Sequence, residues 1–155
     1  MIYIFDSDSL IDLFRHYYPE RFPSLWVKFD ALVSERRIIS VRDVFNELEK
    51  RGDRLSEWVA SNRSIFHIPT VEEMSFITEI FKIKHFQALI RKKERLEGKP
   101  VADPFVIAKA KVGAGCVVTQ ERQTENAAKI PNVCEHFKIQ CVNLETFMKN
   151  ENWTF

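Results

Sequence analysis

The first fourteen residues constrain the fold more than any other stretch, and their sequence is MIYIFDSDSLIDLF. Positions 2–5 form an unbroken run of apolar residues, which is typical of a strand covered on both faces in a parallel sheet. Four small polar residues follow, and Leu10, Ile11 and Phe14 then recur at helical spacing. A strand that ends in carboxylates at the start of a helix places acid where open α/β sheets bind ligands.

The composition is that of a soluble globular protein, with 155 residues, 45% hydrophobic and 29% charged. This length suits a single domain over residues 1–155. No apolar run approaches the ~20 residues of a membrane span, and we expect neither a membrane segment nor a signal peptide. The cysteines are odd in number and lack C-x-x-C spacing, which favours a reducing, cytoplasmic setting.

Short strands alternate with helical patterns along the whole chain. Besides the first strand, apolar runs predict strands at residues 38–39, 65–68, 116–119 and 141–144. Thr70 and Glu73 form a capping-box pattern that opens the longest expected helix, which runs to about Leu96. Asp103 and Pro104 predict the N-cap and first residue of another helix. We therefore expect a three-layer α/β/α fold around a mostly parallel five-stranded sheet.

Four carboxylates are candidates for one site: Asp6, Glu47, Asp103 and Glu121. Two of them follow predicted strands, and two lie in or at the start of predicted helices. Glu125 is a rival for the fourth position, and Asp43 lies one turn before Glu47 on the same helix. Each alone has an ordinary explanation, as a turn residue, a solvated helix acid or an N-cap. Asp8 adds like charge beside Asp6, which normally requires a compensating cation.

Taken in order, these motifs resemble those of the PIN-domain nucleases. With h for a hydrophobic residue, the matching segments are hhhD-S-x-x-L-I (3–11), I-S-x-x-x-x-x-x-E-L (39–48), A-D-P-F-V-I-A-x-A (102–110) and V-V-T-x-E (117–121). The family often has Asp at the position of Glu121, and a small polar residue or Asn at that of Asp8. The resemblance spans essentially the whole chain and is greatest to an uncharacterised stand-alone PIN-like family. Chains of this length resemble VapC-like toxins of type II toxin–antitoxin pairs.

The resemblance implies an endoribonuclease that depends on Mg²⁺ or Mn²⁺ and leaves 5′-phosphate and 3′-hydroxyl ends. Asp6, Glu47, Asp103 and Glu121 would be its catalytic residues and metal ligands, because hard oxygen ligands suit these ions and the ions offset the repulsion between carboxylates and phosphate. The residues expected to support them or to position water are Ser7, Asp8, Ser9 and Thr119. The implied partners are an RNA substrate, a cognate antitoxin and a second copy in a homodimer.

A basic segment precedes the third acidic motif. Residues 82–99 carry seven Lys or Arg against two Glu, although the net charge of the chain is only +1. We interpret five of these cations as RNA-binding through phosphate contacts: Arg91, Lys92, Lys93, Arg95 and Lys99. The alternative is a solvated helix end, where cations favour the helix dipole.

Two other functions stay open. The stretch F-D-S-D-S-L at residues 5–10 also resembles the D-x-D start of haloacid-dehalogenase-type phosphatases. The later acidic pair of that family is missing, and Thr119-Gln120-Glu121 stands in its place. A non-catalytic RNA-binding or scaffold protein on a PIN-like fold is the second alternative, because a fold does not fix a function. The sequence has an acid at all four positions, which argues against a non-catalytic protein.

Overall fold

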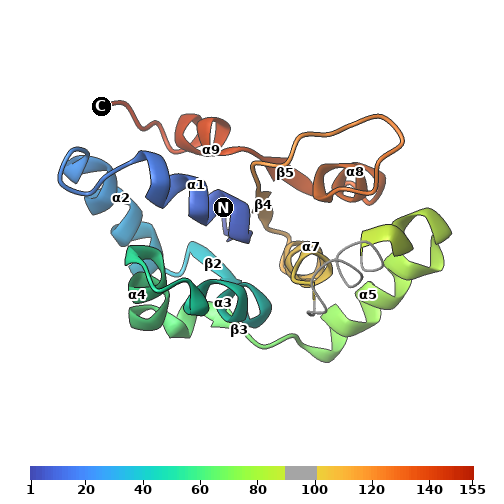
Figure 1. Ribbon diagram of the computed structural model, residues 1–155. Coiled ribbons are helices and arrows are strands. Elements are labelled where there is room, and N and C mark those ends of the chain that lie inside the picture. Colours follow the sequence, from blue (N-terminus) through green and yellow to red (C-terminus); the bar gives the residue numbers. More distant parts are fainter. Residues whose placement is uncertain (90–100) are drawn as a thin grey trace.

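The computed structural model describes residues 1–89 and 101–155 and shows a five-stranded sheet with helices on both sides (Figure 1). The strands are β1 (Tyr3–Phe5), β2 (Ile38–Val41), β3 (Phe66–His67), β4 (Cys116–Val118) and β5 (Gln140–Val142). Their order is β3-β2-β1-β4-β5, and every neighbouring pair is parallel. The expected α/β class is confirmed, and the sheet is parallel throughout.

Helices cover both faces of this sheet. They are α1 (Ser7–His16), α2 (Pro23–Ser34), α3 (Arg42–Leu48), α4 (Arg54–Ser61), α5 (Val71–Lys82), α7 (Asp103–Val112), α8 (Ile130–His136) and α9 (Leu144–Asn150), with 3₁₀ turns η1 (Glu49–Arg51), η2 (Arg63–Ile65) and η3 (Lys84–Gln87). Helix α7 contacts β1, β2 and β4, and α5 packs on α7. Figure 1 shows α1, α2 and α9 on the other side of the sheet from α7. Within the described ranges, no helix has both the length and the apolar character to cross a membrane.

Strand β1 is the central strand and is buried on both faces. Tyr3, Ile4 and Phe5 are each at most 1% exposed. The rings of Tyr3 and Phe5 both meet Phe147 of α9 edge to face, with centroids 4.7 and 5.2 Å apart. Ile4 pairs with Ile39 of β2 on one side, and with Val117 of β4 on the other. The apolar run at the N-terminus therefore forms the buried central strand that its pattern predicts.

The expected long helix after Thr70 begins as predicted and ends early. Thr70 Oγ1 accepts from the N–H of Glu73 at 3.1 Å, and Glu73 Oε2 accepts from the N–H of Thr70 at 2.9 Å, so the capping box is present. The predicted end near Leu96 is wrong, because α5 stops at Lys82. The next residue is extended, and the side chain of Gln87 donates to the carbonyl of Phe81 at 2.9 Å. A side chain thus satisfies a carbonyl of the last turn that a continuing helix would have used.

Glu151, just after α9, ties the C-terminal segment to the central strand. Its Oε2 accepts from the hydroxyl of Tyr3 and from Nη2 of Arg37, both at 2.8 Å. Burial opposes ionisation of this carboxyl, but the bonds from Arg37 and Tyr3 and the charge of Arg37 outweigh it and lower the pKa of Glu151. Burial and the bond to Glu151 raise the pKa of Tyr3. The three side chains therefore act as one charge-assisted contact between the two ends of the chain.

Glu151→Gln should lower the free energy of unfolding by about 1 kcal/mol near pH 7, because the charged acceptor of two hydrogen bonds is lost. The pKa of Glu151 is lowered in the folded state. Its contribution is therefore complete above the unfolded pKa of about 4.3 and is lost as the pH falls through the folded value. Urea unfolding near pH 7 and near pH 3 tests this.

The difference between wild type and Glu151→Gln should shrink in acid. Glu145→Gln, an exposed change on α9, is the matched control and should unfold like wild type at both pH values. A Glu151→Gln deficit that is as large in acid as at neutral pH would show that the ionised carboxylate is not the stabilising form.

Candidate functional site

Asp6 lies at the C-terminal end of the central strand and is the N-cap of α1. Its side chain is only 3% exposed. Oδ1 accepts from the N–H of Ser9 at 2.8 Å, and Oδ2 accepts from the hydroxyl of Thr119, the residue after β4. The hydroxyl of Ser9 donates back to the carbonyl of Asp6 at 3.0 Å. The carboxylate is thus held from two sides, by the helix that it begins and by the end of the neighbouring strand.

The electrostatics of Asp6 are unusual for a helix cap. Burial raises its pKa to about 7, against the hydrogen bonds from Thr119 and Ser9, which lower it, and the charge of Asp8 raises it slightly further. Burial therefore opposes the ionised form, which is the form that the dipole at a helix N-terminus favours. A strongly perturbed acid at the carboxyl edge of a parallel sheet is instead typical of a functional group, and a nearby cation would favour its ionised form.

Glu47 is connected to Asp6 through one residue. The hydroxyl of Ser7, the first residue of α1, donates to Oε2 of Glu47 on α3. Glu47 and Asp8 are both exposed, whereas Asp6 is buried. The first and second predicted acids therefore lie on adjoining elements at one edge of the sheet, with Ser7 between them.

Asp103 lies at the N-terminus of α7 and is 8% exposed. Because α7 leads back into the parallel strand β4, its N-terminus belongs to the edge where β1 and β4 end. The prediction that Asp103 is an N-cap is wrong. Ala102 is the cap: its backbone is already helical, and its carbonyl accepts from Phe105 and Val106. Capping thus does not explain a buried carboxylate here, although the helix dipole favours negative charge at this end.

Glu121 lies between the end of β4 and the start of α8. Its N–H donates to Oγ1 of Thr119 at 3.1 Å, and its Oε2 accepts from the N–H of Ile130 at 3.0 Å. The bond to Ile130 satisfies a donor at the N-terminus of α8, a structural role that the sequence reasoning missed. Glu125 is exposed in the loop that follows. Of the two candidates for the fourth acid, Glu121 is the one bonded to the residue that holds Asp6.

Two further polar side chains at this edge were given no role in the sequence reasoning. Ser40, fully buried in β2, donates to the carbonyl of Phe5 at 2.6 Å and so ties β2 to β1 just before Asp6. Asp43, 9% exposed on the first turn of α3, has a buried Oδ2 that is without a hydrogen-bond partner. Burial raises the pKa of Asp43. The sequence does contain a signal for Asp43: it lies four residues before Glu47, which places both acids on one face of α3.

The donors at this edge fit a hydrated divalent cation. They are carboxylate and hydroxyl oxygens, which Mg²⁺ and Mn²⁺ prefer, and the orphaned Oδ2 of Asp43 is a buried acceptor that a cation or its water would satisfy. In the parts of the chain that the structure covers, no three His, Cys, Asp or Glu side chains are gathered closely enough to hold an ion. The acids therefore do not form a closed cage among the described residues.

The predicted RNA-binding cations lie outside the described residues. They are Arg91, Lys92, Lys93, Arg95 and Lys99. Of the predicted supporting residues, Ser9 and Thr119 contact Asp6, Ser7 contacts Glu47, and Asp8 acts on Asp6 through its charge.

Residues 3–155 match the family described as "Domain of unknown function (DUF4411)". The chain belongs to the DUF4411 family. No curated protein sequence matches it. Among solved structures, this DUF4411 chain is similar to VapBC2 from Rickettsia felis bound to a DNA fragment from its promoter, with 15% identity, a TM-score of 0.50, and coverage of 92% of this chain and 98% of that chain. A second structure, PAE2754 from Pyrobaculum aerophilum, has 15% identity, a TM-score of 0.43, and coverage of 97% and 88%. The similarity to VapBC2 shows a shared PIN-like fold.

Asp6→Asn should change how stability depends on pH when divalent cations are removed by a chelator. The pKa of Asp6 is about 7 in the folded protein and about 3.9 when unfolded. The folded state therefore keeps a proton that the unfolded state loses, and this residue makes the free energy of unfolding fall as the pH rises from about 4 to 7. Urea unfolding in EDTA across this range should show a shallower decline for Asp6→Asn than for wild type. Glu35→Gln, an exposed change at the end of α2, should keep the wild-type decline, and an equal decline in Asp6→Asn would exclude Asp6 as its source.

Glu121→Ala should destabilise the protein by about 1 kcal/mol, because the N–H of Ile130 at the start of α8 loses its acceptor. Glu121→Gln retains a side-chain oxygen at the same position and should unfold close to wild type. Thermal unfolding of both variants tests this, with Glu125→Ala in the same loop as the matched control. Equal stability of Glu121→Ala and Glu125→Ala would mean that the bond to Ile130 contributes nothing.

Proposed function

We propose that this protein is a Mg²⁺- or Mn²⁺-dependent endoribonuclease, the toxin of a toxin–antitoxin pair, acting in the cytoplasm. One observation carries the proposal: Asp6 is buried at the carboxyl end of the central strand, fixed by Thr119 and Ser9, with Glu47 linked to it through Ser7. The PIN-like fold and the order of the four acidic motifs support the same reading.

The residues that would hold the cation, one or two directly and the others through its water molecules, are Asp6, Glu47, Asp103 and Glu121. When bound, Mg²⁺ or Mn²⁺ supplies a Lewis acid that neutralises phosphate charge and lowers the pKa of a water molecule. Thr119 and Ser9 keep the Asp6 carboxylate in one orientation, and Ser7 orients Glu47.

The proposed partners follow from the same comparison. VapBC2, whose fold this chain shares, is a toxin–antitoxin complex, which supports an antitoxin as the protein partner. A homodimer and the guidance of RNA by the basic segment at residues 91–99 belong to the proposal as well. Single-stranded RNA is the substrate class to test first.

Asp103→Asn should abolish metal-dependent cleavage of a labelled single-stranded RNA, because it removes a ligand charge while keeping the side-chain shape. The free energy of unfolding in EDTA should stay unchanged or rise slightly, since Asp103 is not the cap of α7. Cleavage is measured by gel with Mg²⁺, Mn²⁺ or EDTA, and sequencing of the RNA ends should find 5′-phosphate and 3′-hydroxyl groups. Glu125→Gln, an exposed change, is the control and should cleave like wild type.

Several outcomes would contradict the proposal. Cleavage that persists in EDTA or in Asp103→Asn would exclude the metal-dependent mechanism. A large loss of stability in Asp103→Asn would make Asp103 a structural residue. RNA binding without cleavage by the wild type would identify a non-catalytic RNA-binding protein. Turnover of an aryl phosphate with a trapped aspartyl-phosphate at Asp6 would identify a phosphatase instead.

A further inference from the structure

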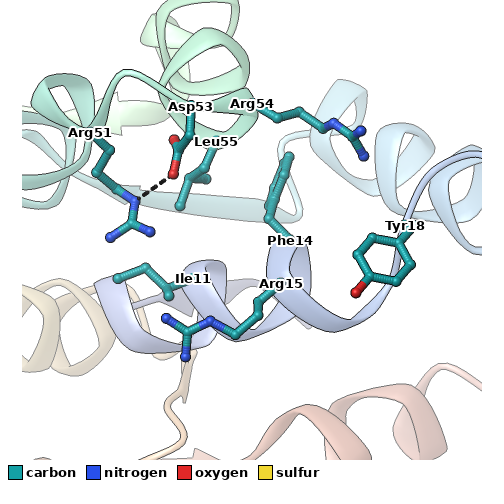
Figure 2. Close-up of a pocket in the computed structure, with 8 residues that line it drawn as sticks. All are labelled: Ile11, Phe14, Arg15, Tyr18, Arg51, Asp53, Arg54 and Leu55. Atoms are coloured by element: carbon teal, nitrogen blue, oxygen red, sulfur yellow. Dashed lines mark hydrogen bonds and ion pairs between the residues drawn. The ribbon is translucent and has the colours of Figure 1, made fainter.

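A pocket of about 350 Å³ lies between α1 and the segment formed by η1 and α4 (Figure 2). Its apolar wall comes from Ile11 and Phe14 of α1 and Leu55 of α4. A polar rim surrounds that wall, with the half-exposed ring of Tyr18 on one side. This volume is at the lower end of the range for small-ligand sites, about 300–1,000 Å³, and is too small for a docked helix, which needs an extended groove.

Three arginines from separate elements line the rim: Arg15 of α1, Arg51 of η1 and Arg54 of α4 (Figure 2). Their side chains are 61%, 36% and 49% exposed. Each has one acidic neighbour, Asp12, Asp53 and Glu20 respectively, at 4.0, 3.0 and 3.4 Å. Exposed pairs of this kind are worth about 0–1 kcal/mol, so an incoming anion competes with them easily.

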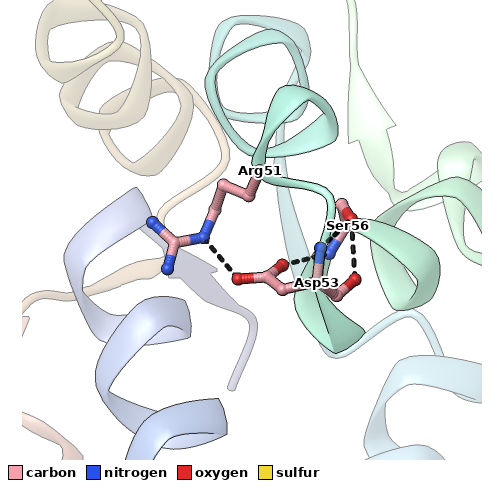
Figure 3. Close-up of polar contacts among 3 residues, drawn as sticks. All are labelled: Arg51, Asp53 and Ser56. Carbon is pink, nitrogen blue, oxygen red and sulfur yellow. Dashed lines mark hydrogen bonds and ion pairs between the residues drawn. The ribbon is translucent and has the colours of Figure 1, made fainter.

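Arg51 is the most firmly placed of the three (Figure 3). Its Nε donates to Oδ2 of Asp53 at 3.0 Å, and Oδ1 of Asp53 accepts from the N–H of Ser56 at 3.0 Å in the capping box of α4. The helix cap thus orients Asp53, and the hydrogen bond to Asp53 places the guanidinium of Arg51 at the rim. The terminal nitrogens of Arg51 point toward Ile11 on α1 in Figure 2, and they carry four N–H donors suited to a phosphate.

The pocket lies beside the two segments that carry the proposed active site, α1 with Ser7 and α3 with Glu47. Ile11 follows Ser7 by four residues on α1, which is about 6 Å along the helix axis. Arg51 follows Glu47 by four residues, and Ser7 and Glu47 are themselves hydrogen-bonded. A strand whose phosphodiester lies at the acidic edge would therefore reach the pocket with a neighbouring nucleotide.

The chemistry of the pocket matches one nucleotide of a single strand. Guanidinium groups bind phosphate through paired hydrogen bonds. Bases of single-stranded RNA stack on aromatic rings and guanidinium planes, and an apolar wall excludes water from the base.

We propose that the pocket between α1 and α4 holds a nucleotide that flanks the cleaved bond of the RNA, with Arg15 and Arg51 on its phosphate, and with Tyr18 and Arg54 beside its base on the other side of the pocket. This inference rests on the proposed ribonuclease function. The three arginines are positioning residues: they set where the strand lies and take no part in the reaction at the acidic edge.

RNA binding measured in an Asp103→Asn background, where cleavage is blocked, tests the pocket directly. Fluorescence anisotropy with a labelled single-stranded RNA, repeated across a range of salt concentrations, gives affinity and salt slope. Arg15→Gln with Arg51→Gln should weaken binding by about 10-fold or more, and the slope should fall by about 0.7 for each phosphate that the variant no longer binds. Arg51→Lys should restore only part of the affinity, because Lys keeps the charge without the paired donors.

Cleavage kinetics without the Asp103 change supply the second readout. The arginine variants should raise KM with a smaller effect on kcat, as expected for residues that position the strand. Lys28→Gln, which removes an exposed cation on α2, is the matched control and should leave affinity, slope and KM unchanged. Tyr18→Ala should weaken binding without changing the salt slope.

Each outcome decides between the two proposals. If the wild type cleaves RNA and the arginine variants bind it like Lys28→Gln, the pocket proposal is overturned and the ribonuclease function stands. The pocket proposal is also overturned if the arginine variants keep the RNA affinity of the wild type but no longer capture a co-expressed antitoxin. The pocket is then a protein-binding surface. If the wild type cleaves no RNA, the function fails, and the binding measurement, which needs no cleavage, decides on the pocket alone.

Discussion

The bond between the hydroxyl of Thr119 and the carboxylate of Asp6 joins residues that are 113 positions apart. It forms because β1 and β4 are parallel neighbours in register from Tyr3–Cys116 to Phe5–Val118, so the next residue of each strand reaches the same edge. The donated hydrogen bond helps a buried carboxyl remain in the protein interior, where an unsatisfied polar group would cost about 1–3 kcal/mol. Asp6 also caps α1. The first residue of that helix, Ser7, donates to Glu47 on α3.

The buried carboxyls of the acidic edge lower the stability of the folded protein. Asp6, Asp43 and Asp103 are each less than 10% exposed, and the pKa values of Asp6 and Asp43 are raised by burial. A core of the same shape without these charges would be more stable, because burying carboxylates is unfavourable. A ligand that binds only the folded state raises the free energy of unfolding by mass action and offsets this loss of stability.

Features with local causes could be predicted from the sequence. The apolar run before Asp6, the capping box of Thr70 and Glu73, and the alternation of strands and helices each follow from residues within a few positions of one another. The end of α5 could not be predicted, because apolar residues continue at buried positions such as Phe86 and Leu89 after the helix has stopped. Apolar spacing reports burial, whereas the backbone leaves the helix at Ile83 and the side chain of Gln87 bonds to the carbonyl of Phe81.

The roles within the site were predictable only in part for the same reason. An Asp before Pro fits the N-cap and the first helical residue equally well, and the helical backbone of Ala102, which is buried, decides between them. The hydrogen bond from the N–H of Ile130 to Glu121 joins residues that are nine positions apart, and no periodic pattern in the sequence indicates it. The unpartnered oxygen of Asp43 depends on what surrounds it in space. The family resemblance placed four acids in order, but their individual contacts come from tertiary packing.

The central position of β1 also sets when the site can exist during synthesis. Residues 3–6 are synthesised long before β4, one of their two neighbouring strands, which begins at Cys116. Pairing between segments so distant in sequence is slow and comes late in folding. A nascent or truncated chain that ends before Thr119 therefore lacks both a side of the central strand and the hydroxyl that fixes Asp6. The acidic edge can therefore be assembled only once β4 and Thr119 are in place beside β1.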